Sequence, residues 1–282
     1  MRVLSRRILV VILLTLASAW GWNNGGAAAR QLIQSQERDS LLYVGEELEY
    51  KVSYSIFTLG RIRIRVFEKS EENNRSVYKA QAYIDSAPGL PFVNLHILFE
   101  SSFDENVYSY SWVSRDSSKS ETAILAYLFD YVQNIVLIEK SLQKRGSERV
   151  VEKVDTLWLK EKAQDGLSLF FFARKNLHLT AELNTPTVIG NAAVNTYFNY
   201  PHQRKSVDID AVDYPVDVIE FSGRADYSGV FGMNGAFRGW FSNDSARVPV
   251  VARMKVLIGS IYIELTRWSR QDWQPPKFEK AE

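Results

Sequence analysis

The stretch GEELEYKVSYSIFTLGRIRIRV, residues 45–66, alternates apolar and polar side chains almost without interruption. Charged and small polar residues occupy one face of each run, and the FTLG segment at 57–60 separates the two runs. The apolar face contains Leu48, Tyr50, Val52, Tyr54 and Ile56, and then Ile62, Ile64 and Val66. Such alternation is typical of antiparallel strands with one solvated side. We therefore expect a hairpin that turns at 57–60.

Similar strand-like segments recur along most of the chain. They lie at 77–85, 96–104, 107–115, on both sides of a turn at 131–134, and at 148–159, 192–200, 203–210, 214–223 and 248–265. Residues 86–95, SAPGLPFVNL, interrupt the series with two prolines and a glycine. Such a wide connection is the best candidate for a lid or for a loop at the mouth of the sheet.

A single helix is expected at DGLSLFFFARKNL, residues 165–177. The carboxylate of Asp165 can accept backbone N–H groups of the first turn. The apolar residues of this segment leave little polar surface, so the helix should be buried on most sides. A long run of strands must also curl or split to cover its apolar face. We expect a mainly β fold: a strongly curved antiparallel meander, an open or half barrel, with this buried helix on its concave side.

The N-terminus has the pattern of a signal peptide. Arg2, Arg6 and Arg7 precede the apolar run ILVVILLTLA at 8–17, and small residues suited to cleavage follow, so that cutting is expected after Ala19 or Ala29. A run of ten is too short to cross a bilayer as a helix, which takes roughly 20 residues. The periplasm is therefore the expected location, and retention by an uncleaved N-terminal anchor is the alternative.

The remaining chain divides by composition. After a signal peptide within 1–29, residues 30–40 read as a linker, 41–270 as a single β-rich domain and 271–282 as a polar tail. Loss of the three signal-peptide arginines leaves 31 basic and 33 acidic residues, a net charge of −2. A near-neutral chain lacks the basic surface of a nucleic-acid binder. The absence of cysteine excludes disulfides, thiol catalysis and a lipid-modified N-terminal cysteine.

No sequence motif indicates catalysis, a metal or a cofactor. His96, His178 and His202 are the only histidines, and their spacing is not that of a metal site. The sequence contains no nucleophile elbow, phosphate loop or dinucleotide fingerprint. The acidic series Asp208, Asp210, Asp213 and Asp217 has apolar residues between its members, which favours strand and turn positions over a calcium loop. We expect no catalytic residues, no metal site and no cofactor.

Two sets of residues are candidates for ligand binding. Arg61, Arg63 and Arg65 share one strand face, where guanidinium groups could bind a lipid phosphate or an anionic glycan. Alternatively, Glu47 and Glu49 on the partner strand neutralise them as cross-strand pairs. The second set is apolar and lies in the helix: Leu167, Phe170 and Phe171. It either lines a cavity or fills the interior, as interiors are densely packed.

Three segments resemble an exported bacterial family known as domain of unknown function 3108. They are the opening hairpin at 45–66, DGLSLFFFAR at 165–174 and GWFSNDSARVPVVARMKVLIGSIYIELT at 239–266. The positions that carry the resemblance are Asp165, Trp240, Ser242, Asp244, Pro249, Gly259 and Leu265. The resemblance implies an envelope-located, mostly antiparallel β protein and assigns no catalytic residues. In outline the expected fold is also similar to the curved sheets of periplasmic lipoprotein carriers.

The leading functional hypothesis is a non-catalytic protein of the periplasm or cell envelope that binds an amphiphile, a lipid or a lipoprotein-like ligand, or an envelope partner. After signal cleavage its association with the membrane would be peripheral at most. The second hypothesis is an assembly protein that docks another chain on a sheet edge or on the 86–95 loop. The third is a hydrolase, for which distant carboxylates such as Asp165, Asp226 and Asp244 would have to converge in a cleft.

Overall fold

The computed structural model describes residues 41–280, apart from 73–74, 91–93, 179–180, 227–234 and 256–258. All of them belong to the larger of two compact units, 41–282. The expected signal peptide and linker lie outside the described residues, as do part of the 86–95 loop and three residues before Gly259.

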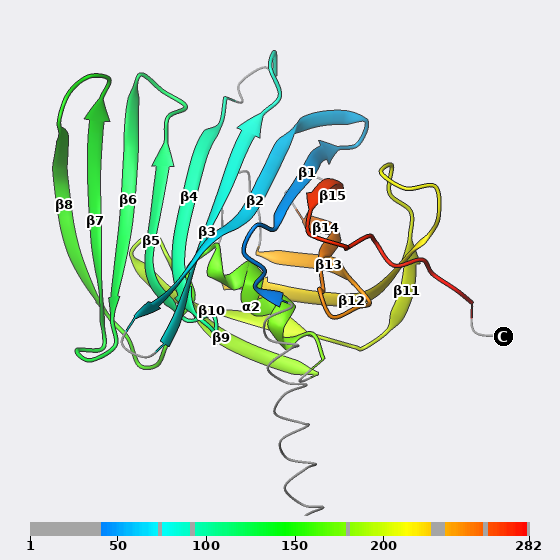
Figure 1. The fold of residues 1–282 in the computed structure, drawn as a ribbon. Helices are drawn as coiled ribbons and strands as arrows, with labels where there is room; N and C mark the ends of the chain where they lie inside the picture. Colours follow the sequence, from blue (N-terminus) through cyan, green and yellow to red (C-terminus); the bar gives the residue numbers. More distant parts are fainter. Residues whose placement is uncertain are drawn as a thin grey trace, which may run out of the picture. The chain divides into compact units, whose positions relative to one another are not determined.

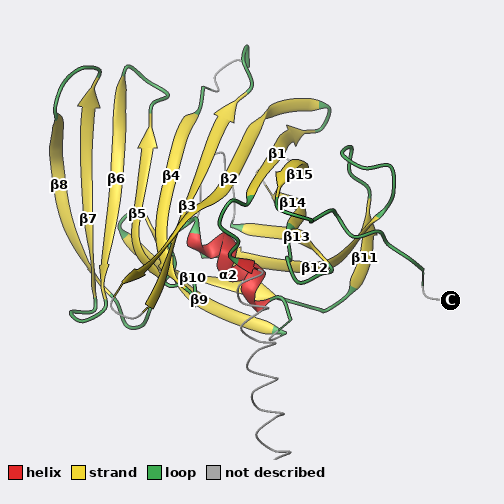
Figure 2. Cartoon of the chain, in the orientation of Figure 1, coloured by secondary structure: helices red, strands yellow, loops and turns green. Residues whose placement is uncertain are grey.

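All strands that the structure describes lie in one 15-stranded antiparallel sheet (Figures 1 and 2). Its first half contains β1 (Glu47–Tyr54), β2 (Phe57–Glu72), β3 (Arg75–Ser86), β4 (His96–Asp104), β5 (Ser109–Asp116), β6 (Glu121–Asp130), β7 (Ile135–Lys144) and β8 (Arg149–Trp158). The second half contains β9 (Glu182–Ile189), β10 (Ala192–Asn199), β11 (Arg204–Val207), β12 (Val216–Ala225), β13 (Ala236–Ser242), β14 (Pro249–Lys255) and β15 (Ser260–Ser269).

The strand order is that of a meander whose two halves join in the middle of the sheet. It runs β8-β7-β6-β5-β4-β3-β2-β1-β15-β14-β13-β12-β10-β9, and β11 pairs with β12 beside this path. β1 and β15 pair antiparallel, with Leu48 opposite Trp268 and Val52 opposite Ile263. The expected curved antiparallel meander is therefore confirmed, and the sheet does not close into a barrel.

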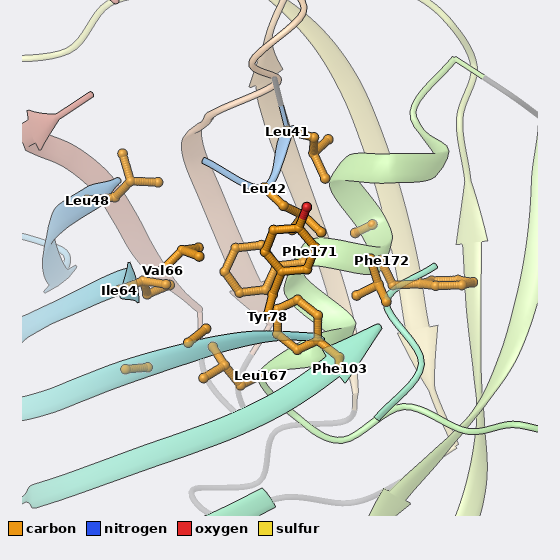
Figure 3. Packing of buried hydrophobic residues seen from close by; sticks show 14 of the residues in the cluster. Leu41, Leu42, Leu48, Ile64, Val66, Tyr78, Phe103, Leu167, Phe171 and Phe172 are labelled. Atoms are coloured by element: carbon orange, nitrogen blue, oxygen red, sulfur yellow. The ribbon is translucent and has the colours of Figure 1, made fainter. Parts of the chain in front are cut away.

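The main core lies on one face of the sheet, around the helix α2 (Ser168–Asn176) (Figure 3). Its buried side chains come from β1 to β7, from the helix and from the second half of the sheet. Phe171 packs on Phe103 of β4 with ring centroids 5.1 Å apart, and Phe172 lies 6.3 Å from Phe198 of β10. The helix thus contacts both halves of the sheet, because the curvature brings them to the same apolar cluster.

A second, smaller core covers the opposite face of β12 to β14. It contains Ile209, Val216, Val218, Trp240, Val250 and Val251. Because both faces are covered there, β12 begins with six consecutive buried residues, Val216–Phe221. Pro249 lies at the start of β14 opposite Phe241, where a bulge between Trp240 and Phe241 shifts the register. A proline that cannot donate to the ladder is tolerated at such an irregularity.

Several local expectations need correction. The hairpin turns at Ser55 and Ile56, and the FTLG segment belongs to β2. The helix begins at Ser168, because residues 165–167 form the turn that Asp165 caps. β9 was not expected, since its sequence ELNTPTVI contains a proline. The polar tail packs on the domain: Trp273 is buried, and Phe278 N–H donates to the Pro215 carbonyl.

Candidate functional site

The three arginines of β2 lie on the outer face of the sheet, as the alternation predicts. Arg65 is opposite Glu47, Arg63 opposite Glu49 and Arg61 opposite Lys51. The side chains of Arg63 and Arg65 nevertheless contact β3. Arg65 donates from Nε and Nη2 to Gln81 Oε1 at 2.8 and 2.5 Å, and the Arg63 guanidinium lies 4.6 Å from the Tyr83 ring centroid.

This contact with β3 continues a polar row across the outer face. Gln81 Nε2 donates to Glu100 Oε1 at 2.8 Å, and Glu100 also accepts from Arg115 of β5. Arg65 is therefore held in a network that joins four adjacent strands. Arg61 lies apart and lines an open pocket of about 350 Å³ with Lys51 and Asp85. The geometry does not present three parallel guanidinium groups to one anion.

The apolar candidates of the helix lie in the packed interior. Phe171 is fully buried and Leu167 nearly so, while Phe170 is partly buried and packs against the same cluster. The rings of Phe170 and Phe171 meet edge to face at 5.1 Å. None of the three described pockets is lined by residues of α2. These side chains fill the space between the two halves of the sheet.

Asp165 is the centre of a buried polar cluster at the start of the helix. Its Oδ1 accepts from the backbone N–H groups of Leu167 and Ser168 at 2.7 and 2.8 Å. Its Oδ2 accepts from Ser101 Oγ of β4 at 2.6 Å and from Ser109 Oγ of β5 at 2.8 Å. Burial raises the pKa of this carboxyl. The capping role expected from the sequence is confirmed, and the same side chain also ties the helix to two strands.

The other acidic and histidine candidates have separate partners. Asp217 pairs with Arg204 at 2.8 Å, Asp210 with Lys51 at 2.5 Å, and Asp226 with Arg224 at 3.1 Å. His96 Nδ1 lies 3.0 Å from Asp85 Oδ1 on the exposed face. Within the described part of the chain, no group of three histidine, aspartate or glutamate residues is placed to hold a metal ion.

Three of the signature residues, Ser242, Asp244 and Pro249, lie in the turn between β13 and β14 or at its two ends. Ser242 Oγ accepts from Val248 N–H at 2.8 Å and donates to Asp244 Oδ1 at 2.8 Å. Asp244 Oδ1 also accepts from Arg247 N–H at 3.0 Å, and its Oδ2 accepts from Trp273 Nε1 at 2.8 Å. Arg247 has a φ of +48°, which this hydrogen bonding stabilises. The aspartate therefore closes a turn and anchors the C-terminal segment.

We predict that Asp244→Ala lowers the free energy of unfolding by about 2 kcal/mol, because three donors lose their acceptor. Chemical denaturation monitored by tryptophan fluorescence measures this change. The matched control is Asp226→Ala, since its exposed pair with Arg224 should contribute less than about 1 kcal/mol. A variant with unchanged stability and a lost cellular phenotype would instead make Asp244 a functional residue.

The strand β8 is the most exposed element of the sheet. It lies at one end of the strand order, and β7 is its sole neighbour among the described strands (Figure 1). Seven of the twelve exposed large apolar side chains of the described residues fall between 128 and 158. They are Leu128, Val132, Leu137, Val150, Val151, Val154 and Trp158. Val154 is 60% exposed and Trp158 74%. By the strand register, Leu128 and Leu137 share one face with Val154 and Trp158. Exposed apolar side chains that gather on one face mark interaction surfaces.

Along its outer side, the backbone of β8 has hydrogen-bonding groups that no other described strand pairs with. Leu159 N–H donates to the Asn134 carbonyl at 2.8 Å, in register with Trp158 opposite Ile135. In an antiparallel ladder, amides of alternate residues face the same neighbour. Leu157, Asp155 and Lys153 therefore face β7, whereas the amides of Val154, Thr156 and Trp158 face the open edge. Such an edge is a template for another strand.

A known protein family matches most of this chain. The family model described as DUF3108, protein of unknown function, matches residues 49–266. The chain belongs to this family. The resemblance of the signature segments is thereby confirmed, and the matched range runs from β1 to β15 and includes both α2 and β8. No match was found among curated proteins.

Two solved structures are similar to this chain to different degrees. A β-barrel-like protein of domain of unknown function DUF1849 from Brucella abortus aligns with a TM-score of 0.54 and 10% identity, over 82% of this chain and 99% of that one. A Bacteroides fragilis protein described as exported, with a YmcC-like fold, aligns with a TM-score of 0.34 and 8% identity, over 81% and 97% of the two chains. The first likeness extends to the fold alone.

Sequence reasoning identified β8 as a strand of the family domain but not as its exposed edge. A signal was present: ERVVEKVDTLW places charges on both faces, and edge strands commonly carry charge. That signal did not say which strand lacks a neighbour, because strand order depends on the whole chain. Among the helices that the structure describes, none is long and apolar enough to span a bilayer.

Proposed function

We propose that this DUF3108 protein is a non-catalytic protein of the cell envelope that binds a partner protein by strand addition at β8. The observation that carries the proposal is the open edge of β8, where outward-facing amides and exposed apolar side chains occur together. In strand addition, main-chain hydrogen bonds supply affinity and alternate side chains supply specificity. The basic, apolar and small-residue pattern of residues 1–29 supports export.

The interior gives less support to the amphiphile hypothesis. Helix residues that would line a lipid cavity pack instead against β4 and β10, at Phe103 and Phe198. The exposed apolar side chains Leu128, Leu137, Val154 and Trp158 on the outer side of β6 to β8 are available to an acyl chain as well as to a strand. Binding of a strand and binding of an acyl chain can be distinguished at this surface, because a strand needs hydrogen bonds from the outward amides of β8 and an acyl chain does not.

The test places a photo-crosslinking residue at Val154 in the exported chain within intact cells. We expect a protein adduct from this position and none from Ile56, which is more exposed and lies in the β1–β2 turn. Thr156→Pro should abolish the adduct, because the ring removes an outward amide and blocks an approaching strand. The fold should survive, because proline is tolerated where its nitrogen faces away from the sheet.

Circular dichroism and melting temperature establish that Thr156→Pro is folded. An adduct that persists in this folded variant would contradict strand addition. Adducts of equal yield from Ile56 would show that contact at β8 is unspecific, and adducts that contain lipid in place of protein would favour the amphiphile.

A further inference from the structure

We propose that the strand added at β8 is β8 of a second copy of this chain, paired antiparallel about a two-fold axis at Val154. This inference rests on the proposed strand addition and names its occupant. A two-fold pairing is isologous, so each edge closes the other and neither remains open. The charges of β8 determine which register such a pair can adopt.

The geometry of an antiparallel pair allows few registers between β8 and β8 of a second copy. Residues directly opposite each other in an antiparallel pair point to the same face, so a two-fold axis must pass through a residue. An axis at Leu157 or Trp158 would leave at most three residues of each β8 strand paired, because the strand ends at Trp158. Toward the other end, the regular part of β8 offers four centres: Lys153, Val154, Asp155 and Thr156. Beyond them, the register shift opposite Lys140 and Ser141 interrupts the strand.

Charge selects among the four centres. An axis at Lys153 sets Lys153 against itself, and an axis at Asp155 does the same for that carboxylate, so both registers are repulsive. With an axis at Thr156, no charged residue of β8 faces a charged residue of the second β8. An axis at Val154 puts Lys153 of each copy opposite Asp155 of the other. This register therefore has two complementary ion pairs.

The local structure favours these pairs. Leu157 packs against the core, so the alternating residues Asp155 and Lys153 share its face, and they form an intrachain pair at 2.9 Å. Lys140 of β7 lies opposite Lys153, which adds positive charge where Asp155 of the second copy would arrive. On the other face the two Val154 side chains meet. Apolar contact then extends toward Leu137 and Trp158, whose side chains are exposed in the isolated chain.

The test uses two charge reversals, Lys153→Asp and Asp155→Lys. Each variant alone would set like charges opposite each other twice, so each should dimerise at least about ten-fold more weakly than the wild type. An equimolar mixture restores both opposite-charge pairs, although neither variant keeps the intrachain pair. We expect a dimer in the mixture with an affinity near that of the wild type, measured by sedimentation equilibrium.

The matched control is Lys79→Asp, which reverses a partly exposed charge on β3, away from β8, and should leave the dimer intact. A wild type that stays monomeric at about 100 μM would overturn the inference, since a micromolar dimer is populated there. Equal dimerisation of wild type and both single variants would do so too, because it would place the axis elsewhere. Either result would exclude pairing with a second copy at Val154 but not strand addition by a different protein, which the crosslinking experiment at Val154 tests separately.

Discussion

Replacement of Arg174 by methionine is expected to lower the free energy of unfolding by about 3–5 kcal/mol, because it removes one partner of a fully buried ion pair. Arg174 donates from Nη1 and Nη2 to Glu46 at 2.6 and 3.1 Å, and both side chains are almost completely buried. It also donates to the carbonyls of Ala246 and Arg247. The substitution removes those hydrogen bonds and leaves Glu46 with Arg270 as its remaining cation, at 2.6 Å.

Urea denaturation at neutral pH measures this loss. The control is Lys79→Met, which breaks the partly exposed pair between Lys79 and Glu68 and should change stability by less than about 1 kcal/mol. If the Arg174→Met variant were as stable as the wild type, the buried ion pair would contribute no more to the free energy of unfolding than the packing of methionine does. The pair joins the helix to the residue before β1, so its loss should also loosen the start of the domain.

Asp165→Ala should lower the free energy of unfolding by about 3 kcal/mol. The loss of a helix cap contributes roughly 1 kcal/mol, and buried hydroxyl and amide donors without an acceptor contribute the rest. Four donors depend on this carboxylate: Leu167 N–H, Ser168 N–H, Ser101 Oγ and Ser109 Oγ. The same denaturation assay applies. A loss below about 1 kcal/mol would mean that the cluster rearranges without the carboxylate.

Asp165→Asn provides a control for charge, because it keeps an acceptor oxygen and cannot titrate. Burial raises the pKa of Asp165 above its ordinary 3.8, so the folded state holds the proton more tightly than the unfolded state. The associated stability is complete below the unfolded pKa and is lost as pH rises through the folded pKa. The stability of the wild type relative to Asp165→Asn should therefore fall as pH rises. The opposite slope would mean that the hydrogen bonds outweigh burial.

These stability effects separate the structural residues from the candidate interface. Asp165 and the Asp244 turn, identified through the family resemblance, have hydrogen-bond partners that account for them within the fold. The exposed apolar residues of β8 are not among the buried residues of the main core. They therefore contribute little to its packing. Substitutions at β8 should therefore affect association while leaving folding nearly unchanged.

The expectations that held depend on neighbours in the sequence. The alternation at 45–66 determined a hairpin with Leu48 and Ile64 on the buried face, because successive side chains of a strand point to opposite faces. Asp165 was recognisable as a cap because its backbone partners are two and three residues away. The turn at Ser55–Ile56 was misplaced by two residues, since hairpin boundaries depend on the pairing of both strands.

What only the tertiary structure decided involves partners distant in the chain. Arg65 contacts Gln81 of β3 although Glu47 lies directly opposite on β1, because both neighbouring strands offer partners and alternation alone does not choose between them. Arg174 meets Glu46 across 128 residues of sequence. β8 became an edge because β1 pairs with β15 and places the two halves side by side. The sequence alone determined the strands and their buried faces through local periodicity, whereas their order, and with it the open edge, required the pairing of the whole chain.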